Sequence, residues 1–151
     1  MRRRRWLGLA AGSFALYALG ERTNADESQA SLSFQELYQT RGVLGMVFSE
    51  KTRALDHKEV RILGFMAPPL KPEVKFFVLT RAPVALCPFC NSDADWPSDI
   101  VVVYPKAREG WSQDGLPVAV RGTLEVGSKV DRETGFVSLV RIVDAEVKTI
   151  K

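Results

Sequence analysis

Short apolar runs rich in β-branched and aromatic residues recur along the chain, and turn-forming segments separate them. Residues 60–66 alternate with a period of two, which is the pattern of a strand with one buried face, and Pro68-Pro69 follows as a stop. Further apolar runs lie at residues 76–79, 100–104, 118–126 and 136–142. The turn or loop segments lie at residues 56–57, 106–115 and 127–135. This pattern predicts an all-β fold.

The number of strands limits the architecture further. Five or six short strands with irregular loops favour a small OB-like barrel over a sandwich, which usually needs seven or more strands. One short N-terminal helix is expected in addition, because Ser33-Phe34-Gln35-Glu36 fits a capping box. Leu37 and Tyr38 would extend this helix, Gly42 would end it, and it would cover one barrel end or edge. We expect residues 33–151 to form this single domain after a loose polar segment at 26–32.

The first 25 residues have the layout of a secretory signal peptide. Arg2 to Arg5 are followed by a fourteen-residue apolar run and by small residues up to Ala25. An uncleaved anchor is the alternative, but the run is shorter than the about 20 residues that span a bilayer. The arginines also fit a twin-arginine signal, so the export route stays open. We expect an exported protein, periplasmic or secreted, without a stable membrane span after cleavage.

Removal of this segment changes the charge balance. The chain has 21 Lys plus Arg and 18 Asp plus Glu, and residues 1–25 contain five of the former and one of the latter. The remainder therefore has 16 against 17, a net charge of −1. A protein that binds nucleic acid needs a surplus of cations for phosphate contacts. The sequence thus disfavours a nucleic-acid partner.

Both cysteines of the chain lie in Cys87-Pro88-Phe89-Cys90. This spacing allows a disulfide, a redox pair or two ligands of a metal ion. Glutaredoxins use a similar motif at the start of a helix, but here Pro97 and an expected strand follow it, so a thioredoxin-like enzyme is disfavoured. A short ring is expected in an oxidising compartment, as a structural or slowly exchanging bridge.

A zinc or copper ion is the alternative occupant of the cysteine segment, and no other cofactor is expected. A closed zinc site needs four ligands, and the candidates are Cys87, Cys90, Asp93, Asp95 and His57. Met66 would suit a copper ion if it faced the same way. The competing interpretations are a solvated acidic loop for the aspartates and an exposed turn for His57, which is the only histidine.

The order of several segments carries a resemblance to a known family. These segments are Lys58 to Pro68, Phe76 to Leu79, the cysteine motif, Ile100 to Tyr104, and Val118 to Gly127. Together they resemble an uncharacterised family of small exported bacterial proteins with an OB-like core, often associated with ABC-transporter components. That family commonly has a His soon after the Cys. This chain has Asn91 after Cys90, so the resemblance carries over only Cys87.

Two classes of function remain. The first is a non-enzymatic accessory or binding protein of the bacterial envelope that serves a transporter system. The second is a thiol-based redox or metal-handling protein that works through Cys87 and Cys90. No catalytic residue is predicted, because one histidine on an expected turn leaves no material for a Ser-His-Asp or Cys-His device.

Overall fold

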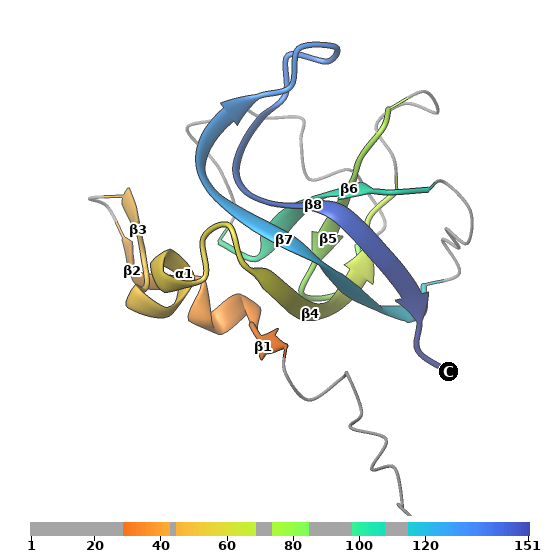
Figure 1. The fold of residues 1–151 in the computed structure, drawn as a ribbon, viewed down its shortest axis with the longest axis horizontal. Helices are drawn as coiled ribbons and strands as arrows, with labels where there is room; N and C mark the ends of the chain where they lie inside the picture. The colour runs from red at the N-terminus through yellow and green to blue at the C-terminus, as the bar shows by residue number, and fades with distance from the viewer. Residues whose placement is uncertain (1–28, 43–44, 69–73, 85–97, 108–114) are drawn as a thin grey trace, which may run out of the picture.

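The computed structural model describes residues 29–42, 45–68, 74–84, 98–107 and 115–151, which form a closed β-barrel (Figure 1). The wall consists of five strands: β4 (Glu59–Met66), β5 (Phe77–Thr80), β6 (Ile100–Pro105), β7 (Pro117–Val130) and β8 (Val137–Thr149). They pair in the order β4-β5-β6-β8-β7, and β7 pairs with β4 to close the ring. The β6–β8 pairing is parallel and the other four are antiparallel. This confirms the predicted small all-β barrel of OB-like strand number.

The predicted N-terminal helix is a single 3-10 turn. This turn, η1 (Phe34–Glu36), has the expected capping box, in which the amide and the hydroxyl of Ser33 both donate to Glu36 Oε2, over 2.9 and 2.8 Å. The expected extension through Leu37 and Tyr38 is wrong. Tyr38 instead begins β2 (Tyr38–Gly42), which pairs with β3 (Gly45–Phe48), and its ring stacks on that of Phe48 at 5.2 Å. Pairing across this hairpin therefore outweighs continuation of the helix.

The chain enters the barrel wall earlier than the sequence suggested. Within the segment expected to be loose, β1 (Ala30–Ser31) pairs in parallel with β4, and Leu32 is 2% exposed. Phe34 and Leu37 are buried in the same apolar cluster as the inward side chains of the wall. The N-terminal turn therefore packs against the barrel core, as expected for a helix covering an end or edge.

A second helix was not anticipated from the sequence. This helix, α1 (Glu50–Ala54), follows Ser49, whose hydroxyl accepts a hydrogen bond from the amide of Thr52 at 3.0 Å. That contact satisfies one of the free donors at a helix start. Lys51 of α1 reaches back to Glu36 of η1, with Nζ 2.6 Å from Oε1. The helix thus connects the β2–β3 hairpin to the turn before β4.

Inside the barrel, β4 needs glycine where the neighbouring strand comes close. A Cβ on Gly64 would lie 2.7 Å from the carbonyl oxygen of Thr80 and 3.1 Å from the ring of Phe34. A Cβ on Gly122 of β7 would lie 2.7 Å from both Ile142 Cγ2 and the Val143 oxygen. Contacts this short exclude any side chain, so the two glycines permit the close packing of the wall.

Strands β5 and β6 are buried on both faces. Phe77, Leu79, Val101 and Val103 belong to the inner core. Their neighbours form a second cluster on the outer side, with Phe76 packed between the rings of Tyr104 and Phe136 at centroid distances of 5.4 Å each. The buried members of this second cluster are Ala67, Val74, Phe76, Val78, Ile100 and Val102. Burial on both faces explains the continuous apolar runs in these two strands.

Strands β7 and β8 are longer than predicted. Part of the expected 127–135 loop belongs to β7, and the tight turn begins at Asp131, whose Oδ1 accepts hydrogen bonds from the Glu133 and Thr134 amides. In Figure 1 the two strands curve together away from the rest of the wall toward this turn. Gly127 has φ +109 and accompanies a register shift between Val126 and Lys129. A bulge, not a loop, thus accounts for the glycine.

Candidate binding surface

The cysteine segment lies between β5 and β6, and Cys87, Cys90, Asp93 and Asp95 fall outside the described residues. The structure does define where this segment leaves and rejoins the barrel. Thr80 pairs with Ile100 in the β5–β6 ladder. The amide of Arg81 donates to the carbonyl oxygen of Asp99 at 3.2 Å, and the side chains of Arg81 and Asp99 lie 3.8 Å apart. The residues on either side of the cysteine segment are therefore held next to each other by backbone pairing.

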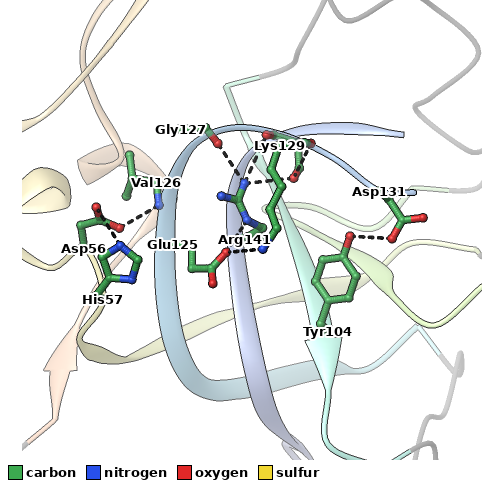
Figure 2. A network of polar contacts seen from close by, with 10 residues as sticks. Asp56, His57, Tyr104, Glu125, Val126, Gly127, Lys129, Asp131 and Arg141 are labelled. Carbon is green, nitrogen blue, oxygen red and sulfur yellow. Dashed lines mark hydrogen bonds and ion pairs between the residues drawn. The ribbon is translucent and has the colours of Figure 1, made fainter. Parts of the chain in front are cut away.

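His57 occupies an exposed turn before β4, as the sequence suggested. Its φ is 58°, its side chain is 75% exposed, and its Nε2 lies 3.7 Å from Asp56 Oδ2 (Figure 2). The other carboxylate oxygen of Asp56 accepts the amide of Val126 at 2.9 Å, which fastens the turn to β7. Met66 packs against the barrel core. Among the residues that the structure describes, no group of three or more His, Cys, Asp or Glu side chains is placed to hold a metal ion.

A buried arginine in β8 is the centre of the polar network in Figure 2. Arg141 is 5% exposed, and its Nε lies 2.7 Å from Glu125 Oε2 on β7. Its Nη1 donates to the carbonyl oxygen of Gly127 at 2.9 Å and to Ser138 Oγ at 3.2 Å. Lys129 provides a second cation for Glu125, at 2.9 Å. The bulge at Gly127 turns this carbonyl toward the guanidinium, so the network joins the two long strands.

The carboxylates of this region are held in their charged form. Burial alone would raise the pKa of Glu125, but hydrogen bonds from Lys129 and Arg141 outweigh it and lower the pKa below the ordinary value. Asp131 follows the same pattern: hydrogen bonds from Thr134, Tyr104 and Glu133 overcome the effect of burial and lower its pKa. Burial and the Asp131 charge raise the pKa of Tyr104 to about 12, so its hydroxyl remains a donor to Asp131, at 3.1 Å. This network stabilises the β7–β8 pair.

The outer side of β4, β7 and β8 offers a different surface, which we call the mixed face. It comprises the outward residues Glu59, Arg61, Leu63, Ala119, Arg121, Thr123, Asp144, Glu146 and Lys148. Strand register places Arg61 opposite Arg121 and Arg121 opposite Glu146. In the next row, Leu63 lies opposite Ala119, and Ala119 lies opposite Lys148. The inward neighbours Val60, Ile62, Val118 and Val120 are all buried.

Two hollows lie on the mixed face and share Arg121 and Glu146. The smaller, of about 150 Å³, is bordered by two ion pairs: Arg121 with Glu59, and Lys106 with Glu146 at 3.4 Å. The hydrogen bond from Arg121 lowers the pKa of Glu59. The larger hollow has a volume of about 280 Å³. Its lining consists of Gln29, Arg61, Ala119, Arg121, Glu146, Lys148, Thr149 and Ile150.

This arrangement can bind and orient charged groups beside apolar ones. Leu63, 49% exposed, stands in the same row as Ala119 and Lys148, and Leu116, 43% exposed, precedes β7. Sequence reasoning did not single out Arg61, Arg121 or Lys148 as site residues. Their outward alternation is readable in each strand, but their meeting depends on pairing between distant segments.

Comparison with known proteins shows the fold alone. No protein-family model and no curated protein matches the chain. A crystal structure of a DUF3299 family protein from Pseudomonas aeruginosa PAO1 is similar, with a TM-score of 0.51 and 16% sequence identity. The likeness covers 82% of this chain and 97% of that chain. In the described residues of this chain, no helix has the length and apolar character to cross a membrane.

Proposed function

We propose that the protein is an exported, non-enzymatic accessory protein of the bacterial envelope that binds a protein partner through the mixed face. The observation that carries the proposal is Leu63, a large exposed apolar side chain of the barrel wall that lies in one row with Ala119 and Lys148, next to the row of Arg61 and Arg121. Protein interfaces commonly combine an apolar centre with a polar, charged rim. The expected partner is a transporter component, as the family resemblance implies, and the expected location is the periplasm or the cell exterior.

The charge distribution supports a protein partner over a nucleic acid. The mixed face carries Arg61, Arg121 and Lys148 together with Glu59 and Glu146, so both signs are interspersed. A surface that follows a phosphate backbone would be expected to carry one sign only. Interspersed charges instead favour a partner of complementary pattern, because like charges brought together across an interface are strongly unfavourable.

Site-directed crosslinking in the native envelope tests this proposal. A photoreactive phenylalanine analogue at Leu63 should give a defined adduct with one envelope protein, which mass spectrometry then identifies. Val130 is the matched control, because it is also apolar and exposed, at 56%, but lies at the far end of β7. Leu63→Glu should abolish copurification of the same partner and Val130→Glu should not. Equal adducts at both positions, or none at Leu63, would contradict the proposed surface.

The redox or metal-handling function is the second candidate. It rests on the spacing of Cys87 and Cys90, which suits a disulfide, a redox pair or two ligands of a metal ion. The variant with Cys87→Ser and Cys90→Ser separates the two functions. If this variant loses bound metal, or loses exchange with a thiol reagent, the second candidate is supported. If it loses metal and exchange but still binds the partner, the two functions are independent. Unchanged partner binding without any metal or exchange in the wild type supports the first.

A further inference from the structure

The larger hollow of the mixed face contains two cations to which the described residues offer no carboxylate. In the described part of the chain, neither Arg61 nor Lys148 has a carboxylate within 4.0 Å, although both line this hollow. Glu146 also lines it, but its carboxylate is in contact with Lys106 at 3.4 Å. Arg121 is likewise committed to Glu59. The hollow therefore has a surplus of positive charge.

Strand register brings two of the cations of the hollow close together. Arg61 lies directly opposite Arg121 on the same face, and like charges in opposing positions of an antiparallel pair are destabilising. Glu59, which lies in the adjacent row opposite Thr123, compensates for Arg121. Arg61 is partly buried and receives no such compensation among the described residues. An oxyanion bound beside Arg61 would relieve the repulsion.

The shape of the hollow suits such an anion. Ala119 stands between Leu63 and Lys148 in one cross-strand row, and its small side chain leaves room above the wall. The volume of about 280 Å³ is several times the roughly 30 Å³ that a water molecule occupies in the liquid. Thr149 and Gln29 add polar side chains to the border. A carboxylate or phosphate group with its attached atoms would fit this space.

We propose that this hollow is an oxyanion site in which Arg61 and Lys148 bind one carboxylate or phosphate group. The guanidinium fork of Arg61 matches either group in a bidentate manner, and Lys148 contributes a point charge. The inference deepens the proposed function, since the site lies on the same face, and the anion can belong to a free small molecule or to an acidic side chain of the bound partner. Leu63 lies beside the site and contacts the apolar part of what carries the anion.

Titration with phosphate and with glutarate, followed by amide NMR at constant ionic strength, tests the site. Saturable shifts are expected around Arg61, Ala119 and Lys148, with dissociation constants of about 1 mM, as befits one small oxyanion. Arg61→Gln and Lys148→Gln should each weaken binding by about tenfold, the amount expected for one charge-assisted hydrogen bond. Arg132→Gln, which removes an exposed cation at the β7–β8 turn, should change binding by less than about twofold.

The outcomes of this titration and of the crosslinking separate this inference from the proposed function. Shifts that stay linear up to about 50 mM, or that persist in the Arg61→Gln, Lys148→Gln double variant, would overturn the oxyanion site. If glutarate or phosphate added before irradiation suppresses formation of the Leu63 adduct, the anion belongs to that partner; if it binds without changing the adduct yield, the anion is a free ligand. A Leu63 adduct that forms equally in the double variant would leave the partner surface standing and remove the oxyanion site from it.

Discussion

Arg141 is a buried charged side chain whose neighbours compensate for its burial. It is 5% exposed, yet it contacts one carboxylate, two backbone carbonyls and one hydroxyl. Removing a cation from water is expensive unless it is paired and hydrogen-bonded, and the contacts of Nε and Nη1 offset this cost. The charge of Glu125 depends on Arg141 in turn. The Glu125 side chain is only 21% exposed, and Lys129 is the other cation that contacts its carboxylate.

Arg141→Met is therefore expected to lower the free energy of unfolding by about 2 to 3 kcal/mol. The value lies near the lower end for a broken buried pair, because Glu125 keeps Lys129 and some solvent. Urea unfolding measures it. Lys129→Met is the control, with an expected loss below about 1 kcal/mol for an exposed pair. A stability of Arg141→Met equal to that of the wild type would mean that the network contributes nothing.

The lowered pKa of Glu125 predicts a loss of stability in acid. A carboxyl group whose folded pKa lies below its unfolded value contributes stability that is complete above the unfolded value, 4.5, and is lost as the pH falls through the folded pKa. Unfolding measured between neutral pH and pH ~3 should thus show a smaller pH dependence for Glu125→Gln than for the wild type. Asp144→Asn, at an exposed position of the barrel face, serves as control. Identical slopes for Glu125→Gln and the wild type would refute the assignment.

At the scale of elements, the pairing of β5 with β6 determines what the cysteines can contribute to stability. Thr80 and Ile100, and then Arg81 and Asp99, already hold the two sides of the segment together. A bridge between Cys87 and Cys90 would close only a very short ring within it. Because a ring this short removes little conformational entropy from the unfolded chain, the bridge adds little to the stability.

We accordingly expect the double variant Cys87→Ser, Cys90→Ser to lose at most about 2 kcal/mol of unfolding free energy. In metal-free, air-equilibrated wild type, alkylation followed by mass spectrometry should find no free thiol. Two free thiols would exclude the bridge. A stoichiometric ion released by acid would make the metal site the correct interpretation of this segment.

The five wall strands were predictable because each carries its own signal, either alternation as in residues 60–66 or an apolar run buried on both faces as in 100–104. The β2–β3 hairpin and α1 were not, since both are short and depend on contacts with η1, such as Lys51 with Glu36. Gly127 suggested a loop, but it marks a bulge. The mixed face could not be predicted from the sequence, because Arg61 comes to lie opposite Arg121 only when β4 pairs with β7 and closes the barrel.

At the scale of the whole molecule, the two apolar clusters are inseparable. Phe77 and Leu79 face the inner core while Phe76 and Val78, in the same stretch of chain, belong to the outer cluster. Neither cluster can open without exposing residues of the other, so the barrel should unfold in one cooperative step. The N-terminal segment joins this unit through β1 and η1, although it precedes every strand of the wall.

This dependence predicts where the chain can be shortened. Leu32, Phe34 and Leu37 are 2%, 3% and 0% exposed, and burial of such side chains contributes about 1.5 to 3 kcal/mol each. Their joint loss, on the order of 5 to 9 kcal/mol, approaches the whole stability of a small domain. A chain that begins at Asp26 should therefore give the same cooperative thermal transition as the full chain, and so should the control that begins at Gln29. A chain that begins at Tyr38 should show none by circular dichroism. Removal of the expected signal peptide at Ala25 would meet this requirement, because it leaves Leu32, Phe34 and Leu37 in the barrel. An intact thermal transition in the chain that begins at Tyr38 would show that the N-terminal segment is dispensable.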